Sequence, residues 1–407
     1  MNKTISESIS VIIPTFNFKD SLIKVLMSTF NQTIKPKQII IVDSSPSNSI
    51  EIAIENFKSK NQKKNIEIIL LKQKNRTFPG KARNIGAKYA TGSILAFLDS
   101  KTIPENSWLE ESLIKMNEEN LDLVFGKTRY LSSNKKQKII KDSVYGNIDH
   151  VTTPGSLIKS EVFFDLNCFF MENVRTVEDI YWRFQLVNKK LNIGYPIKAN
   201  LSYSEIPNSI ISMQQRFFNY SLNIIKVNIQ NNIKELYLSL LIILSAILIP
   251  KWNIIVDSYE LPFFYLPHIT KIYLFLFFFI FFINVLFRYL FTKFFHETFF
   301  YLTLKYTIFV LTVWVVLNWN DRIAEWATTS VYYIPHITKI YLITIIIVFY
   351  FIRGIYLPIK RKVLFKDIFP FRWILIGFVG ISLDIMKAPG YLLGAIFSLK
   401  YIFFKQK

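Results

Sequence analysis

The sequence predicts a doubly wound α/β domain followed by an α-helical transmembrane region. Two observations lead to this fold class. Up to about residue 235, short β-branched runs alternate with longer amphipathic segments, which is typical of a parallel sheet covered by helices. From Leu236 onward, long stretches of Phe, Ile, Leu and Tyr replace that alternation. The hydrophobic fraction of 51% therefore averages over two halves that we expect to lie in different solvents.

The N-terminal half contains the predicted sheet. Buried parallel strands are expected at residues 9–13, 38–42, 66–71 and 94–98, separated by helices near 19–30, 48–61 and 80–90. Ligands of such sheets bind beyond the carboxyl ends of the strands. Asp43 and Asp99 directly follow two of these strands, so they would contact a ribose, an exocyclic amine or a metal on a diphosphate. Taken singly, each aspartate would more often be a helix cap or a turn residue.

The C-terminal half contains four mainly apolar runs, at residues 236–249, 272–291, 299–317 and 340–357. A helix needs about 20 residues to cross about 30 Å of hydrocarbon, and the runs predict about four transmembrane helices within 236–358. The even connections are richer in Lys and Arg, which places them and the N-terminal domain in the cytoplasm. Residues 359–407 form a basic loop and two short apolar segments, 373–383 and 391–404, which predict interfacial or re-entrant helices separated by a break at 384–390.

Charge and cysteine content exclude several classes of protein. The net charge of +20 is not gathered into one basic tract with interleaved aromatics, so we expect no nucleic-acid partner and instead a membrane lipid surface and a phosphate-bearing substrate. The single cysteine, Cys168, excludes an intrachain disulfide and a thiolate metal cluster, and we interpret it as a core residue. The first apolar run is too short for a signal peptide.

Four blocks in the N-terminal half resemble glycosyltransferase family 2. They are ISVIIPTFN at residues 9–17, IIVD at 40–43, GKARNIGA at 80–87 and GSILAFLD at 92–99. Each block alone is weak evidence, but their order and spacing match the GT-A fold of that family over roughly residues 9 to 205. The resemblance is to its membrane-anchored bacterial type. It implies a nucleotide-sugar-binding domain over residues 1–210.

The resemblance implies a role for each matching position. Pro14, Thr15 and Asn17 would line the nucleotide pocket, Asp43 would contact the base, Arg83 and Asn84 would lie beneath the sugar diphosphate, and Asp99 would take the first acidic place of the D-x-D metal motif. Lys101 stands at the second acidic place. One carboxylate holds Mg²⁺ or Mn²⁺ less well than two. Two interpretations stay open: a transferase in which Lys101 supplies positive charge, and a degenerate site.

A further acidic pair, Glu178-Asp179, lies within RTVEDIYWR at residues 175–183 and resembles the Glu-Asp pair of the family. The resemblance implies that Asp179 is the general base that takes the proton of an acceptor hydroxyl, with Glu178 beside it. Trp182 and Arg183 are then counted among the substrate contacts. The alternative for the pair is plain charge at a helix N-terminus, which the helix dipole favours in any protein.

Residues 213–218 resemble the Q-x-x-R-W motif of processive polysaccharide synthases only faintly, because the Trp is missing, so a processive polymerase is disfavoured. We interpret residues 211–235 as an amphipathic interfacial linker that places Arg216 at lipid headgroups. An ordinary packing helix is an equally good interpretation.

The resemblance implies an inverting glycosyltransferase that moves a sugar from a nucleotide-diphosphate sugar to a lipid-linked acceptor at the cytoplasmic membrane face, in cell-surface polysaccharide biosynthesis. Two alternatives remain. A catalytically inactive membrane scaffold is favoured by Lys101. A membrane-bound nucleotidyltransferase is disfavoured, because residues 14–17 are not the Gly-rich loop that such an enzyme needs after its first strand.

Overall fold

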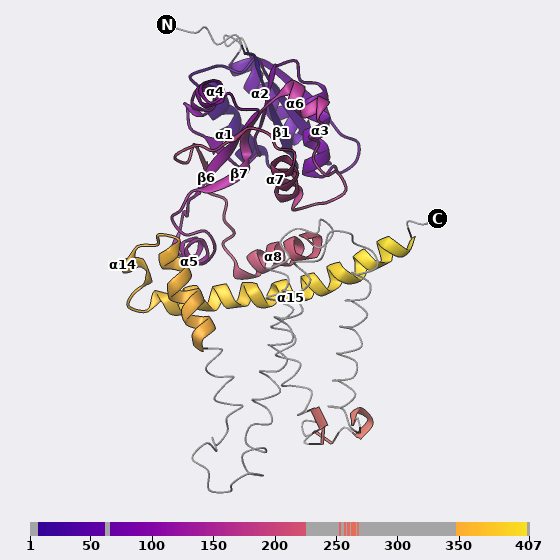
Figure 1. Cartoon of the computed structure of the whole chain (residues 1–407), viewed down its shortest axis with the longest axis vertical. Coiled ribbons are helices and arrows are strands. Elements are labelled where there is room, and N and C mark those ends of the chain that lie inside the picture. The colour runs from indigo at the N-terminus through magenta and orange to yellow at the C-terminus, as the bar shows by residue number, and fades with distance from the viewer. Residues whose placement is uncertain are drawn as a thin grey trace. The chain divides into compact units, whose positions relative to one another are not determined.

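A computed structural model describes residues 7–61, 66–224 and 347–404, together with residues 252–253, 256–257, 259–260, 262–265 and 267 (Figure 1). The chain divides into two compact units, Met1–Ile229 with Tyr350–Lys407, and Gln230–Phe349. The first three predicted transmembrane runs lie outside the described residues, and the fourth is described only from residue 347. The fold and the candidate site below belong to the first unit.

The described residues of this unit form a mixed sheet with the strand order β3-β2-β1-β4-β7-β6-β9-β5, and β8 pairs with β6. Its parallel half contains β1 (Ile9–Thr15), β2 (Gln38–Asp43), β3 (Glu67–Lys72) and β4 (Ile94–Phe97). The other strands are β5 (Ile103–Pro104), β6 (Leu123–Tyr130), β7 (His150–Lys159), β8 (Ile193–Gly194) and β9 (Leu201–Tyr203). The antiparallel pairing of β7 with β4 begins this second half. The predicted α/β fold with four parallel strands is confirmed.

Helices cover both faces of the sheet, as a doubly wound domain requires. They are α1 (Lys19–Phe30), α2 (Ser49–Lys60), α3 (Pro79–Lys88), α4 (Trp108–Glu118), α6 (Ser160–Asp165) and α7 (Glu178–Asn188). Two further helices, α5 (Lys135–Val144) and α8 (Ile210–Ile224), pack against the C-terminal helices instead (Figure 1). One apolar core joins alternate residues of β1 to α1, α2 and α4, and the other joins Ile12 to α3 and α7. Each fully buried Val, Ile or Leu stabilises the fold by about 1.5–3 kcal/mol relative to its exposed state. The three predicted helices are confirmed.

The third strand differs from its prediction. The sequence predicts a buried strand at 66–71, but β3 is only half-buried along its length and its two ends, Glu67 and Lys72, are exposed. The reason is its position, because β3 is the edge strand of the sheet and has a neighbour on one side only. Cys168 is buried in the second core, as expected.

The C-terminal part of the unit is a group of helices that ends in one long helix. It contains η2 (Ile352–Tyr356), α13 (Leu357–Lys360), α14 (Phe365–Ile368) and α15 (Arg372–Phe404). The predicted break at 384–390 is wrong, because α15 continues through it with Pro389 inside the helix. Asp384 forms ion pairs with Arg353 and Lys387, which neutralises the charge at this point.

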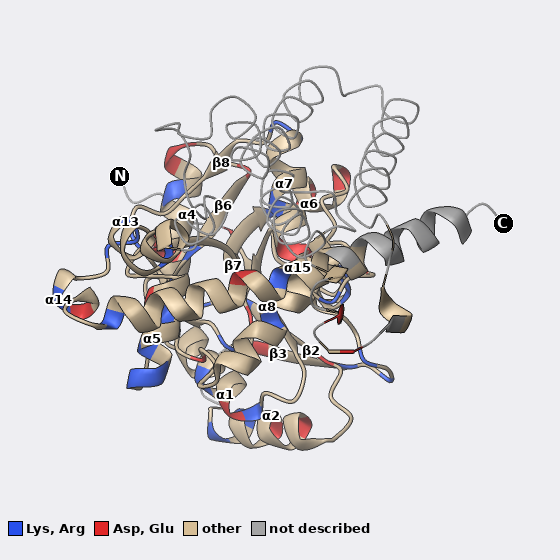
Figure 2. Ribbon diagram, turned by 90° about the horizontal axis from the view of Figure 1, so that it is seen from below, with Lys and Arg blue, Asp and Glu red and all other residues tan. Residues whose placement is uncertain are grey.

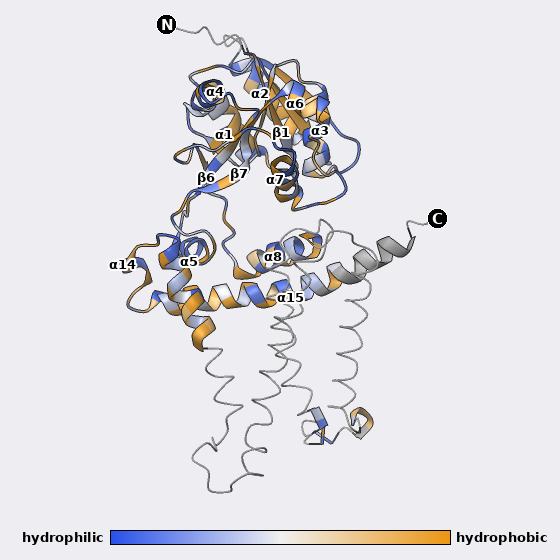
Figure 3. Cartoon of the chain, viewed as in Figure 1, coloured by the Kyte–Doolittle hydropathy of each residue, from blue (hydrophilic) through white to orange (hydrophobic). Residues whose placement is uncertain are grey.

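Because α15 is continuous, its apolar part is longer than the run 373–383 identified in the sequence, and its interfacial or re-entrant placement stays a prediction. Among the described residues, the stretch Arg372–Tyr391 is long and apolar enough for one crossing by length and composition alone, and 39% of its apolar window is buried. Figure 3 shows the hydrophobic residues that begin this helix.

Helices α8 and α15 lie side by side (Figures 1 and 2). They approach closely where α15 carries glycine, since a Cβ atom at Gly390 would lie 2.7 Å from the carbonyl oxygen of Phe218, and one at Gly394 would lie 2.5 Å from that of Leu222. A separate apolar cluster joins both helices to Ile140 of α5. For its described residues, α8 is therefore a packing helix, the second of the two interpretations of this segment.

Candidate active site

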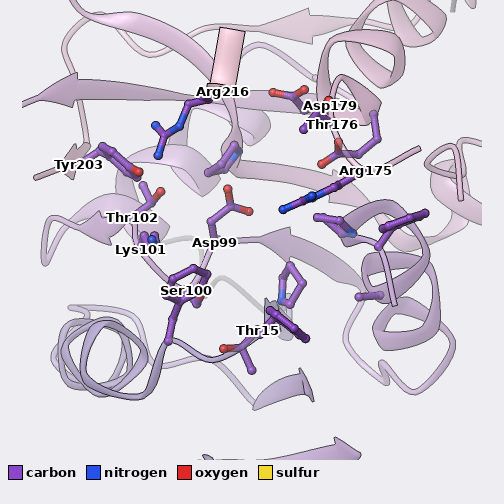
Figure 4. Close-up of a pocket in the computed structure, with 18 of the residues that line it drawn as sticks. Thr15, Asp99, Ser100, Lys101, Thr102, Arg175, Thr176, Asp179, Tyr203 and Arg216 are labelled. Carbon is purple, nitrogen blue, oxygen red and sulfur yellow. The ribbon is translucent and has the colours of Figure 1, made fainter. Parts of the chain in front are cut away.

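A cavity of about 800 Å³ lies at the carboxyl ends of β1 and β4, where the parallel half of the sheet meets the antiparallel half (Figure 4). Its walls come from residues 14–18 after β1, 76–79 before α3, 99–102 after β4, and from parts of β6, β7, α7 and α8. The structure brings Pro14, Thr15, Asn17, Arg83, Asp99, Lys101, Glu178 and Asp179 together in this lining. Eight of the twelve residues proposed from sequence therefore share one pocket.

Arg83 lies at the centre of the acidic residues. Its Nη2 donates to Asp99 Oδ1 at 2.6 Å and its Nη1 donates to Glu178 Oε1 at 3.0 Å. The side chains of Arg83 and Glu178 are 3% and 7% exposed, and that of Asp99 is 39% exposed. Burial raises the pKa of Glu178, and the Arg83 guanidinium opposes this effect. Arg83 thus holds α7 and the end of β4 together through two carboxylates.

Asp179 lies in the first turn of α7 and is half-buried in the pocket wall. Burial raises the pKa of its carboxyl, and the positive charge of Arg83 opposes this effect. Val177, just before α7, adopts a left-handed conformation with φ of 78°, which is strained for a β-branched residue. Such strain is common where a structure fixes functional side chains, and here it lies directly before Glu178 and Asp179.

The residues around Lys101 do not suit a divalent metal. Lys101 Nζ lies 2.9 Å from Glu205 Oε2 and 3.5 Å from the centre of the Phe18 ring. Asp99, the expected metal ligand, is already bound to Arg83. The described residues contain no group of three or more His, Cys, Asp or Glu side chains that would hold a metal ion. A site with one engaged carboxylate and an adjacent ammonium does not fit Mg²⁺ or Mn²⁺.

The pocket lining is rich in positive charge. Five cationic side chains (Arg76, Arg83, Lys101, Arg175 and Arg216) face three carboxylates (Asp99, Glu178 and Asp179), an excess of two positive charges, or of one when Glu205 is counted with its partner Lys101. Arg76 stacks 4.4 Å from the Phe16 ring centre. Within the described part of the chain, Arg76, Arg175 and Arg216 form no ion pair. The pocket lining therefore complements an anion.

The interpretation of Arg216 as a headgroup contact is wrong, because its side chain points into the pocket (Figure 4). Its guanidinium lies in the same pocket wall as the phenols of Tyr203 and Tyr145. The faint resemblance of residues 213–218 to the Q-x-x-R-W motif is the sequence signal that points to Arg216. Sequence reasoning also missed the tyrosines of this wall, which lie on four separate elements and share no motif: Tyr130, Tyr145, Tyr203 and Tyr220.

Three predicted site residues lie outside the lining and have structural contacts instead. Asn84 clamps the chain at Phe170, donating from Nδ2 to its carbonyl and accepting from its N–H, both at 2.9 Å. Trp182 is buried in the core and its Nε1 donates to the Cys168 carbonyl. Arg183 donates to the Val151 carbonyl. These side chains belong to α3 and α7 and make the contacts above within the protein, so their role as substrate contacts stays a prediction.

Asp43 also lies outside the lining, but it supports a residue that lines the pocket. Its buried carboxylate accepts from the backbone N–H of Ser45 at 2.9 Å and from Lys72 Nζ at 2.9 Å. Ser45 Oγ in turn accepts from the N–H of Asn17 at 2.8 Å. Asn17 has a φ of 58°, a left-handed conformation that Asn tolerates better than most residues. The base contact of Asp43 stays a prediction.

The part of the chain that contains this pocket is similar in sequence to known proteins. Residues 10–180 match the model of the family described as Glycosyl transferase family 2. The chain is 27% identical to Glycosyltransferase AglE of Haloferax volcanii over 175 residues, which cover 42% of this chain and 54% of the relative. It is 26% identical to an uncharacterized glycosyltransferase of Methanocaldococcus jannaschii over 275 residues, 61% of this chain and 92% of that relative. The match to AglE thus spans about half the length of that relative.

Two solved structures align with part of the chain. The structure of Staphylococcus aureus TarS 1-349 in complex with UDP-GlcNAc aligns with a TM-score of 0.39 and 18% identity, covering 61% of this chain and 73% of that chain. The mannosyltransferase PcManGT of Pyrobaculum calidifontis, in complex with GDP-Man and Mn²⁺, aligns with a TM-score of 0.41 and 14% identity, covering 55% and 64%.

Proposed function

Since residues 10–180 belong to glycosyltransferase family 2, we propose that the chain transfers a sugar from a nucleotide-diphosphate sugar to an acceptor hydroxyl with inversion. The observation that supports this most directly is the pocket itself. It places a half-buried carboxylate, Asp179, in the same cavity as a cation-rich wall at the ends of β1 and β4.

Asp179 acts as the general base. As the acceptor oxygen attacks the anomeric carbon, its proton passes to the Asp179 carboxylate, and the bond between the anomeric carbon and the diphosphate oxygen breaks. The raised pKa of Asp179 improves proton transfer, because a base works best when its pKa approaches the working pH. One carboxylate is sufficient, and no covalent intermediate is needed.

The leaving nucleotide diphosphate is stabilised by side-chain cations. Arg76 and Arg175 line the pocket and are free of carboxylate partners among the described residues. Guanidinium groups bind phosphate oxygens through paired, charge-assisted hydrogen bonds. Preorganised positive charge at a leaving group is among the largest contributions to catalysis. Lys101 contributes a further charge only when it leaves Glu205, its partner in this structure.

Pro14, Thr15 and Asn17 form the nucleotide end of the pocket. Thr15 Oγ1 is buried and has no hydrogen-bond partner among the described residues. A buried hydroxyl without a partner costs free energy, so this oxygen is available to a polar group of a ligand.

The acceptor is lipid-linked and reaches the pocket at the cytoplasmic membrane face, where its product enters surface glycan biosynthesis. Exposed apolar side chains along α14 and the start of α15, such as Phe365, Leu375 and Phe378, support this attachment. Lys360, Lys362 and Lys366 are exposed beside them, an arrangement that suits anionic lipid headgroups.

The test is sugar transfer by the full chain in detergent, with membrane lipid extract and a panel of UDP-, GDP- and dTDP-sugars. We expect one donor to release its nucleotide diphosphate in a lipid-dependent manner. Asp179→Asn should lower kcat by about 10²- to 10⁴-fold and retain nucleotide binding. Asp165→Asn, an exposed carboxylate outside the pocket, is the matched control. Full activity of Asp179→Asn would remove the base assignment, and silence across the panel would favour the inactive scaffold.

A further inference from the structure

Arg216 and Arg83 are two arginines of one pocket with different surroundings. Arg83 is paired with two carboxylates, Asp99 and Glu178. Arg216 is half-buried, and the neutral phenols of Tyr145 and Tyr203 line the pocket with it. No ion pair joins Arg216 to a carboxylate within the described residues. Phenol oxygens orient a guanidinium but do not neutralise its charge.

A guanidinium that is partly removed from water without a counter-ion lowers stability. Its planar fork of donors matches the oxygens of a phosphate, and it keeps its charge at any physiological pH. Since Arg216 lines the pocket, the group that completes its coordination enters through the pocket (Figure 4). The chemistry of this position is that of a phosphate subsite.

Both the nucleotide-sugar donor and the acceptor would carry a phosphate, and the position of Arg216 in the pocket distinguishes between them. Tyr130 and Tyr220 line the same pocket as Arg216 and Asp179, and Tyr220 lies one turn after Arg216 on α8. Arg216 therefore belongs to the aromatic end of the pocket, beside the proposed base, where the acceptor must bind. Two other cations, Arg76 and Arg175, remain for the donor diphosphate.

We propose that Arg216, which lines the pocket with Tyr145 and Tyr203, binds a phosphate group of the acceptor, so that the substrate class is a phosphate-bearing, lipid-linked acceptor. This proposal rests on the proposed function, because it takes the phosphate-bearing molecule to be the acceptor of the sugar. Helix α8 carries Arg216 at the pocket and packs along α15, whose exposed face is apolar at Phe378 and Ile385. An acceptor with a phosphate next to an apolar tail fits both features.

The test uses decyl phosphate as a competitor of sugar transfer, and decyl maltoside as its neutral counterpart, with the full chain in nanodiscs. Arg216→Gln should weaken competition by decyl phosphate about tenfold or more, and Arg216→Lys should be intermediate because it keeps the charge without the fork. Decyl maltoside should be unaffected. Arg129→Gln is the matched control, since Arg129 is exposed outside the pocket lining and loses the same charge.

Calorimetric titration with UDP and GDP separates the two sources of phosphate. Unchanged nucleotide affinity in Arg216→Gln supports the acceptor, whereas a tenfold loss of nucleotide affinity with unchanged decyl phosphate competition would overturn the proposal and assign Arg216 to the donor. An equal loss for decyl maltoside would also overturn it. If Arg216→Gln does not fold, Arg216→Lys should still weaken decyl phosphate competition about threefold, because it keeps the charge and lacks the planar fork of donors.

Failure of the proposed function is distinguishable from failure of this subsite. If the wild-type chain transfers no sugar, direct calorimetric binding of decyl phosphate still reports on Arg216. Binding that is lost in Arg216→Gln and kept in Arg129→Gln supports the phosphate subsite, and equal binding by both variants contradicts it.

Discussion

The two ends of the pocket are built from different kinds of sequence. At one end, Pro14 and Thr15 end a single buried strand and Asn17 follows it, and Ser45 after the next strand accepts a hydrogen bond from the N–H of Asn17. At the other end, Tyr130, Tyr145 and Arg216 come from β6, the end of α5 and α8. The first end follows from local chain order, whereas the second exists only after distant elements have packed. We expect variants at the two ends to separate donor binding from acceptor binding.

The largest effect is expected at Arg83, which pairs with Asp99 after β4 and with Glu178 of α7. Arg83→Met would leave Asp99 and the buried Glu178 without their counter-ion, and breaking a buried ion pair on one side costs about 3–5 kcal/mol. We expect a lower free energy of unfolding, measured by thermal and denaturant unfolding of the solubilised chain. Lys81→Met is the control, since Lys81 is exposed on the same helix. Equal stability of the two variants would show that the Arg83 pairs contribute little.

Gly394→Leu tests whether α15 positions the acceptor end. Its side chain would collide with the backbone of α8 at Leu222 and displace Arg216 and Tyr220 with it. We expect the KM for the acceptor to rise about tenfold with the nucleotide affinity unchanged. Gly377→Leu is the control, because that glycine faces Tyr350 rather than α8. Parallel losses of donor and acceptor binding would mean that the two ends are not independent.

The pH dependence of transfer sharpens the role of Asp179. Because burial raises its pKa, the carboxylate becomes protonated at a higher pH than an ordinary Asp, whose pKa is about 3.9. A protonated base does not accept a proton, so kcat/KM should fall about tenfold per pH unit below that raised pKa. The measurement is a pH profile of kcat/KM at constant ionic strength. A profile that stays flat down to pH about 4 would contradict the raised pKa.

Lys101→Asp tests the metal interpretation at the donor end. It would add a carboxylate near Asp99 and remove the ammonium that pairs with Glu205. We expect wild-type transfer to persist in EDTA and the variant to become several-fold more active with Mn²⁺ than without it. Loss of wild-type transfer in EDTA would show that the reaction needs a divalent metal and would favour the interpretation of Asp99 as a metal ligand.

Thr15→Val is expected to have the smallest effect. It removes only the hydroxyl that has no partner among the described residues. Nucleotide affinity should fall about three- to tenfold, the range for one hydrogen bond, and the KM for the acceptor should not change. Ser49→Ala, which lies outside the pocket lining, serves as the control in the same nucleotide titration.

The parallel half of the sheet and its strand ends were accessible from sequence because their signals are local. Continuous β-branched runs predict buried strands, and the edge position of β3 is the only misjudgement among the four. The predicted break in α15 failed for a different reason. In the sequence alone, a break in the helix is indicated by Asp384, Lys387 and Pro389. In the structure, Arg353 of another helix neutralises the charge of Asp384.

The order of elements and most of the acidic site were therefore determined by the sequence itself, since strand periodicity and strand-end residues act over a few positions. The tertiary structure decided which side of each helix faces the pocket. It turned Trp182 and Arg183 of α7 into core and backbone contacts, and brought Arg216 to the tyrosines of three other elements. Packing makes that choice, because the rotation of a helix depends on which neighbours bury its apolar face.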